Sequence, residues 1–114
     1  HGHGIYNYTS GKTYAGEWKD NTQTGRGVCT FASGDIYKGQ WENFKKHGKG
    51  TFCFSNGDKY VGHYENDYEH GNGQYIRADG TVHYTGEWAN GKPKSRQSWL
   101  RRHSSLRRQS WLRR

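Results

Sequence analysis

Aromatic residues and glycines alternate with polar residues in two neighbouring segments of the chain. In Y-K-G-Q-W, residues 37–41, Tyr37, Gly39 and Trp41 occupy every second position. Successive side chains of a β-strand point to opposite faces, so these three residues share one face and the polar residues take the other. The segment G-K-G-T-F-C-F, residues 48–54, continues the alternation, and the turn residues S-N-G-D follow it. Together the two segments predict a β-hairpin with one aromatic face and one polar face.

The same pattern recurs with a period of 23 residues. Tyrosines that begin equivalent segments stand at positions 14, 37, 60 and 84, which gives steps of 23, 23 and 24 residues. Glycine pairs of the form G-x-G keep this spacing at 2–4, 25–27, 48–50 and 71–73, and a turn glycine keeps it at 11, 34, 57 and 80. His83 is the additional residue that lengthens the last step. Three landmarks with one period identify a repeat protein.

The glycines inside the strands require a physical reason, because glycine packs no side chain and loses much entropy in a strand. An aromatic ring that lies flat on a sheet needs bare backbone beneath it, and a glycine provides that space. We therefore expect rings of one strand to cover the glycines of the next. An alanine at Gly39 or Gly50 is expected to push a ring off the sheet.

The Y-x-G-x-W segments, the G-x-G pairs, the following aromatics and the turn glycines, at this period, resemble the MORN repeat (membrane occupation and recognition nexus). The resemblance covers residues 1–94. It implies an all-β fold, a long, single-layered, twisted and curved antiparallel sheet with one hairpin per repeat. It also implies a non-catalytic role as a scaffold, a dimerisation module, or a groove for a partner helix or peptide.

Some positions depart from the repeat pattern. Tyr64 stands where the other repeats have Trp, and Arg77 stands where two repeats carry Phe. At the hairpin position where the family often has glycine, Gly91 matches, whereas the other residues are Asn21, Phe44 and Asp67. These departures bear on the geometry of the loops and not on the assignment of the fold.

The pattern divides the chain into two parts. Residues 1–94 form the repeat array, with a partial repeat at 1–13, repeats that begin at 14, 37 and 60, and a partial last repeat from 84. Residues 95–114 form a tail rich in Arg, Trp and Ser. Because the chain begins inside a repeat and without Met, we expect it to be part of a longer sequence.

Positive charge is concentrated at the C-terminal end. Residues 1–91 carry 9 Lys or Arg and 10 Asp or Glu, whereas residues 92–114 carry 9 Lys or Arg and no acidic residue. Hydrophobic residues make up only 29% of the chain, but aromatic residues reach 16%, so the core is expected to consist mainly of rings. No apolar run is long enough to span a membrane, and no signal-peptide pattern is present.

The sequence predicts no catalytic, metal or cofactor site. His47 and His70 are equivalent positions one repeat apart, but successive repeats are separated by two strands, roughly 10 Å, and zinc ligands must lie near ~2 Å from the metal. Glu17 and Glu87 are also equivalent, on a polar face that offers no pocket for acid–base catalysis. Catalytic and phosphate-binding motifs are absent.

The cysteines bear on the cellular compartment. Cys29 and Cys53 are 24 residues apart, one more than the period, so we expect them on opposite faces of the sheet and not in a disulfide. Free cysteines favour a reducing compartment, and hence the cytoplasm.

Eight aromatic residues form two columns along the predicted sheet. We expect them to be the core of a fold that has little other core, and also to leave part of their face uncovered as a groove. An exposed aromatic groove is typical of a binding surface, most plausibly for an apolar helix face or a peptide. The predicted partner-binding residues are Tyr14, Trp18, Tyr37, Trp41, Tyr60, Tyr64, Tyr84 and Trp88.

The tail is itself repetitive, with R-Q-S-W-L-R at 96–101 and at 108–113. We predict a short, weakly amphipathic basic helix that suits an anionic membrane surface, an acidic protein surface or nucleic acid, the last being least favoured. The alternative is a solvated extension. Ser104 and Ser110 follow R-R-x and are candidate phosphorylation sites. The predicted anion-binding residues are Arg96, Trp99, Arg101, Arg102, Arg107, Arg108, Trp111, Arg113 and Arg114.

The sequence thus predicts a non-enzymatic scaffold or protein-interaction module that binds other proteins along its aromatic face and needs no cofactor. On the family resemblance alone, we expect a cytoskeletal, ciliary or flagellar assembly, and the same resemblance allows a homo-oligomer. The alternative hypothesis is a membrane-associated tether that binds anionic lipids through its tail.

Overall fold

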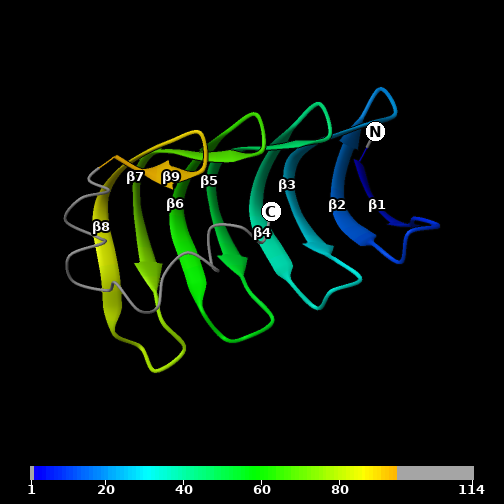
Figure 1. Ribbon diagram of the computed structural model, residues 1–114. Helices are drawn as coiled ribbons and strands as arrows, with labels where there is room; N and C mark the ends of the chain where they lie inside the picture. Colours follow the sequence, from blue (N-terminus) through cyan, green and yellow to red (C-terminus); the bar gives the residue numbers. More distant parts are fainter. Residues whose placement is uncertain (1, 95–114) are drawn as a thin grey trace.

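A computed structural model describes residues 2–94, which form one antiparallel sheet (Figure 1). Its nine strands lie side by side in chain order, so that each strand pairs with the strands before and after it in the sequence. The strands are β1 Gly2–Asn7, β2 Thr13–Lys19, β3 Thr22–Thr30, β4 Ile36–Glu42, β5 Lys45–Cys53, β6 Lys59–Glu65, β7 Tyr68–Ile76, β8 Val82–Ala89 and β9 Lys92–Pro93. This topology confirms the single-layered sheet of tandem hairpins. The helix predicted for residues 95–114 lies outside the described residues.

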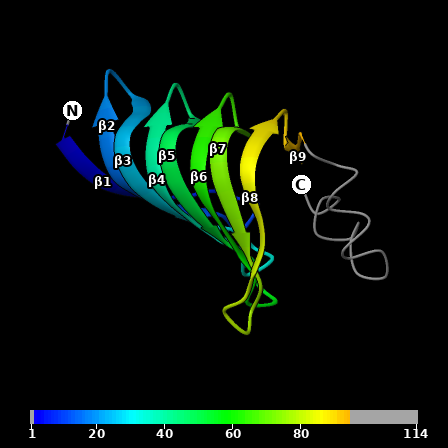
Figure 2. The same ribbon diagram turned by 90° about the vertical axis from the view of Figure 1, so that its left-hand side faces the viewer.

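The sheet is curved when it is viewed from its β8 end (Figure 2). One cause is a bulge that recurs once per repeat. Residues 47–49 of β5 stand opposite the single residue Gln40 of β4, and the same irregularity occurs between β2 and β3 and between β6 and β7. Bulges bend the strand that carries them and increase its twist. Gly48 adopts the positive φ of 73° that this bulge requires.

A side chain of the facing strand binds the backbone of the bulge. Gln40 Oε1 accepts a hydrogen bond from the Lys49 backbone N–H at 2.7 Å. Glu17 Oε1, in the equivalent position, accepts one from the Arg26 backbone N–H at 3.1 Å. Backbone N–H groups in the bulge have no partner in the regular pairing of the strands. The polar side chain after the repeat glycine therefore accepts a hydrogen bond from one of them.

The tyrosine of the repeat lies over a pair of glycines. Tyr37 extends along its own strand, and its hydroxyl donates a hydrogen bond to the Gln40 carbonyl at 2.8 Å. The ring thereby covers Gly39 and Gly50, which face each other across β4 and β5. A Cβ atom on Gly39 would lie 2.6 Å from the Lys49 carbonyl oxygen, and one on Gly50 would overlap the Tyr37 ring. The predicted role of the glycines is confirmed, with the addition that the ring covers its own strand as well as the next.

Aromatic rings form a continuous row across the sheet. Tyr37 meets the ring of its own strand, Trp41, at 5.1 Å between centroids and the ring of the next repeat, Tyr64, at 5.2 Å, with interplanar angles of 89° and 84°. The order of the row is Trp18, Tyr14, Trp41, Tyr37, Tyr64, Tyr60, Trp88 and Tyr84. Edge-to-face contacts are favourable because the positive edge of one ring meets the negative face of another. Tyr64 takes the Trp position without interrupting the row.

The hairpin turns share one conformation although their residues differ. Both central residues have a positive φ, between 50° and 85°, in the turns at residues 20–21, 43–44, 66–67 and 90–91. Gly, Asn and Asp adopt this conformation readily, whereas it strains a bulky residue such as Phe44, whose φ is 66°. The departures at residues 21, 44 and 67 therefore leave the loop geometry unchanged, because neighbouring strands impose the same turn.

His83, the additional residue of the last repeat, forms a bulge in β8. Tyr75 pairs with Tyr84 and Ile76 pairs with Val82, so His83 is the unmatched residue. Its imidazole is buried and stacks on the Tyr75 ring at 6.1 Å between centroids. The sheet thus absorbs the extra residue without a change in strand order.

The cysteines lie on opposite faces, as their spacing predicts. Cys29 is buried on the aromatic face, where it pairs with Tyr14 and Tyr37. Cys53 follows the aromatic-face residue Phe52 and therefore points to the other side. Both are free thiols.

We predict that Gly50→Ala destabilises the sheet, because the added methyl group overlaps the Tyr37 ring and forces it away from the backbone. Overpacking of this kind lowers the free energy of unfolding by about 1–3 kcal/mol. Urea denaturation followed by tryptophan fluorescence measures the loss.

Gly4→Ala is the matched control. Gly4 occupies the equivalent position on the first strand, and a Cβ there would meet nothing closer than 3.4 Å. Equal destabilisation by the two substitutions would contradict the role assigned to the tyrosine ring.

Candidate binding groove

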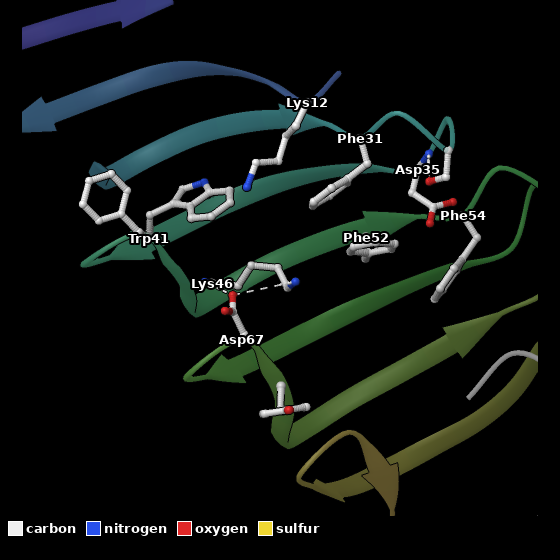
Figure 3. A pocket seen from close by; sticks show the side chains of 11 residues that line it. Lys12, Phe31, Asp35, Trp41, Lys46, Phe52, Phe54 and Asp67 are labelled. Carbon is white, nitrogen blue, oxygen red and sulfur yellow. Dashed lines mark hydrogen bonds and ion pairs between the residues drawn. The ribbon is translucent and has the colours of Figure 1, made fainter. Parts of the chain in front are cut away.

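The aromatic face is hollowed into a groove of about 400 Å³ (Figure 3). Its aromatic lining consists of Phe31, Trp41, Phe44, Phe52, Phe54 and Tyr68. Its charged lining consists of Lys12, Asp35, Lys46 and Asp67. The groove therefore combines a large aromatic surface with a few charged groups of both signs, which is typical of sites that bind an apolar group in a fixed orientation.

Phenylalanines form one wall of the groove. Phe31 and Phe52 stack at 5.8 Å between centroids with an interplanar angle of 29°, and Phe52 contacts Phe54 at 4.8 Å. Phe52 lies on β5, whereas Phe31 and Phe54 lie just beyond the ends of β3 and β5, and all three continue the alternation that begins at the glycine pairs. At the other end of the groove, Phe44 packs against Trp18 at 6.2 Å.

Lys46 reaches into the middle of the groove, between Trp41 and the phenylalanine wall (Figure 3). Its ammonium group lies within 6 Å of several ring centroids, a distance at which a cation is attracted by the ring faces. The distances are 5.9 Å to Phe31, 5.8 Å to Tyr37, 5.3 Å to Phe52 and 5.6 Å to Tyr64. Lys12 makes a similar contact with Tyr8 at 4.5 Å.

Asp67 holds Lys46 in this position. Its Oδ1 accepts a hydrogen bond from the Lys46 backbone N–H at 2.8 Å and lies 3.8 Å from Nζ. The Asp67 backbone N–H donates in turn to the Lys46 carbonyl at 3.0 Å. Since only 14% of the Lys46 side chain is exposed, the carboxylate and the rings together compensate for the burial of its charge.

The sequence did not predict that Lys46, a charged residue, is largely buried on the aromatic face. Gln23 and Glu69 are equivalent to it at the 23-residue spacing, and both are buried on the aromatic face. Charged side chains are mostly exposed, so the residues between Trp41 and Gly48 indicate a polar connection between the two strand segments. The signal that could have revealed this placement is parity, because Lys46 lies an even number of residues before Gly50 and pairs with Trp41 as Gly50 pairs with Gly39.

Most of the predicted partner-binding residues are core residues. The exposed fractions are 0% for Tyr14, Tyr37 and Tyr60, 7% for Trp41, 3% for Tyr64 and 1% for Trp88, whereas Trp18 and Tyr84 are half-buried. Their structural role agrees with the prediction. The ring surface that the groove offers comes instead from other residues, mainly Phe44 and Tyr68, which are 48% and 50% exposed.

The histidines predicted to be solvated or loop-bound pair with acidic residues of the adjacent strand. His47 Nε2 lies 3.2 Å from a Glu42 carboxylate oxygen, and His70 Nε2 lies 3.3 Å from one of Glu65. Within residues 2–94, no group of three His, Cys, Asp or Glu side chains is placed to bind a metal ion. The described part of the chain also contains no helix that could cross a membrane.

The sites predicted on the tail lie outside the described residues. They are Arg96, Trp99, Arg101, Arg102, Arg107, Arg108, Trp111, Arg113 and Arg114, with the candidate phosphorylation sites Ser104 and Ser110.

Burial of the tyrosines beneath the groove makes the fold sensitive to alkaline pH. Desolvation raises the pKa of Tyr14 from 10.0 to about 12, and it also raises the pKa of Tyr37. We predict that the free energy of unfolding falls as the pH rises above 10, because tyrosines ionise there in the unfolded chain while folded Tyr14 stays protonated up to about pH 12. Urea denaturation at a series of pH values measures the slope.

Tyr37→Phe tests the origin of this slope. It keeps the ring but removes both the ionisable group and the hydrogen bond to Gln40, so it costs about 1 kcal/mol at neutral pH and makes the pH dependence shallower. An unchanged alkaline slope would exclude Tyr37 as a contributor.

Comparison with protein-family models identifies the repeat. The MORN repeat model matches residues 1–13, 14–36, 37–59, 60–82 and 84–94. A comparison with curated proteins finds no significant relative. MORN repeats are non-enzymatic modules that generally mediate interactions with proteins or membranes. With five consecutive matches over most of its length, the chain belongs to the MORN-repeat family.

Proposed function

We propose that the protein is a non-enzymatic scaffold module that binds an apolar helix face or a peptide of a partner protein in the groove. The observation that carries the proposal is the groove itself, a hollow of about 400 Å³ that is lined by the buried Trp41 of the ring row and by the exposed rings of Phe44 and Tyr68. Exposed aromatic surface of this kind is characteristic of the centre of protein interfaces.

The backbone at Phe44 supports this function. A left-handed conformation costs a bulky residue roughly 1–2 kcal/mol. The ring remains 48% exposed, so its burial within this chain recovers only part of that cost. A strained residue at the rim of a groove is a candidate for function, and a partner that covers the Phe44 ring would supply the missing burial.

The charged groups of the groove support a partner with polar flanks. Lys12 and Lys46 place cations beside the rings, whereas Asp35 and Asp67 place carboxylates at the groove lining. An amphipathic helix or a peptide can present apolar side chains to the rings and groups of either sign to these residues.

We place this activity in a cytoskeletal, ciliary or flagellar assembly in the cytoplasm. This setting rests on the family resemblance and on the free cysteines, which suit a reducing compartment. Within such an assembly, the array would position partner proteins and would contribute no chemistry of its own.

A membrane tether is the second candidate function. Its support is the composition of residues 95–114, which contain seven arginines, two tryptophans and no acidic residue. Each basic residue near an anionic membrane surface contributes about 1 kcal/mol to binding. Anchoring by the tail is compatible with a partner in the groove, because the two interactions use different parts of the chain.

We predict that the double substitution Phe44→Asn and Tyr68→Thr abolishes partner binding. It copies Asn21 and Thr22, the equivalent residues of the first repeat, so the turn is kept and its strain is relieved. Affinity purification of the tagged protein from its native cells, with quantitative mass spectrometry, compares the partners retained by each variant.

Val28→Thr with Val61→Thr is the control, because these residues are 37% and 39% exposed on the opposite face. It is expected to retain the partners that the groove variant loses. If a folded Phe44→Asn, Tyr68→Thr protein retains the same partners, the groove is not the binding site.

The tether hypothesis predicts that the full chain floats with phosphatidylserine vesicles and not with neutral vesicles. Replacement of Arg101, Arg102, Arg107 and Arg108 by glutamine is expected to reduce the bound fraction several-fold, because four favourable charges are lost. A flotation assay measures both. Absence of binding to anionic vesicles would eliminate the tether.

A further inference from the structure

The polar face of the sheet, opposite to the groove, has a basic centre. Arg26 of β3, Lys38 of β4 and Lys49 of β5 are exposed there and line a shallow depression of about 360 Å³. Within residues 2–94, none of the three forms an ion pair with an acidic side chain. We call these residues, together with Gln40 and His63, the basic patch.

The residue that binds the bulge differs between the centre and the ends of the array. The first and last repeats carry Glu17 and Glu87 at this position, whereas the two middle repeats carry Gln40 and His63. A glutamate is compatible with the bulge, since Glu17 binds the backbone of its bulge as Gln40 does. At this position the middle of the polar face therefore lacks the carboxylates of the first and last repeats. The acidic residues of its middle strands, Glu42 and Glu65, are paired with His47 and His70.

Hydrogen bonding leaves the amide of Gln40 as a donor of the basic patch. The Gln40 Oε1 atom is occupied by the Lys49 backbone N–H, so the amide NH₂ group is left to donate to a ligand. His63 Nδ1 lies 3.3 Å from the Asn72 carbonyl oxygen and donates to it, so this nitrogen is not offered to a ligand. Two ammonium groups and a guanidinium group complete a set that suits an anion.

The spacing of the cations indicates an extended ligand. Adjacent strands lie about 4.8 Å apart, so Arg26 and Lys49, on β3 and β5, are separated by roughly 10 Å across the sheet. One phosphate or carboxylate group would contact all of these cations only if their long side chains converged on one point, which brings three like charges together. Several carboxylates on a chain that crosses the strands can contact them together.

We infer that the basic patch binds a carboxylate-rich segment of a partner protein. Charge complementarity provides the attraction, and the amide of Gln40 adds a neutral donor between the lysines. Because the patch and the groove lie on opposite faces, one array can hold two partners at once.

Gln40→Glu is the sharpest test, because it restores the carboxylate of the first and last repeats and keeps an acceptor for the Lys49 backbone N–H. Binding of a fluorescein-labelled, glutamate-rich peptide to the full chain is measured by fluorescence anisotropy. The substitution is expected to weaken binding about fivefold or more, because it places in the patch a negative charge that repels the carboxylates of the peptide. An unchanged Kd with an intact fold would overturn the inference.

The arginine-rich tail also attracts an acidic peptide, so a second comparison keeps the tail and the net charge constant. Lys38→Glu with Lys49→Glu changes the patch, and Lys19→Glu with Lys92→Glu makes the same charge change at exposed positions away from it. The patch variant is expected to bind at least about tenfold more weakly than the control variant. Equal weakening would mean that only net charge matters, and it would overturn the inference.

Two further arms separate the basic patch from the groove and from a site for a single ion. Phe44→Asn with Tyr68→Thr is expected to leave peptide binding unchanged, so that failure of the groove and failure of the patch are distinguishable. Inorganic phosphate at concentrations equal to the peptide is expected not to displace it. Displacement would indicate a site for one anion and would contradict the proposed extended ligand.

Discussion

The contact between a tyrosine ring and a pair of facing glycines is the interaction on which the rest of the structure depends. Tyr37 can lie flat only because Gly39 and Gly50 present bare backbone, and only a flat ring can meet the rings of its own and the next repeat edge-on. A sheet of one layer has no second sheet or helix to bury its apolar face. The row of rings replaces that layer, which explains how a chain with 29% hydrophobic residues forms a stable sheet.

The architecture could be predicted from the sequence because it depends on two periodicities, the alternation of side chains in a strand and the 23-residue repeat. Residues such as Tyr37, Gly39 and Trp41 follow the first, and the order of the strands follows from the second. Both periodicities can still be recognised despite the substitution of Tyr64 for Trp and the insertion of His83. Tyr64 keeps its ring contact with Tyr60, and a bulge in β8 accommodates His83.

The lining of the groove could not be predicted in the same way. Its central charge, Lys46, occupies the position that pairs with Trp41, but lysine side chains are mostly exposed in proteins, so the residue type indicates a solvated position. Phe44 and Tyr68 lie at hairpin turns, where the side-chain direction depends on backbone angles and not on parity. The predicted site was therefore the row of rings beneath the groove, since these residues carry the strongest pattern. A strong repeating pattern identifies the residues that stabilise the fold. It identifies less well the residues that contact a partner.

The bulge position has a second role that is visible when the repeats are compared. Glu17 and Gln40 both accept a hydrogen bond from the backbone of their bulge, so the fold admits either residue and the choice between them can set the charge of the polar face. The groove thus varies through residues at the hairpin turns, and the polar face varies through residues at the bulges. The tyrosines and glycines of the repeat stay the same.

The continuity of the ring row has a consequence for how such arrays change in evolution. Tyr14, Tyr37 and Tyr60 each touch one ring of their own repeat and one of the next, so the internal repeats have equivalent neighbours. Duplication or loss of 23 residues recreates the same contact at the new junction, whereas an insertion of another length keeps the rings over their glycines only where a bulge absorbs it, as the bulge at His83 does. Recombination between repeats is therefore tolerated structurally, and it lengthens or shortens the binding surface in whole-repeat steps.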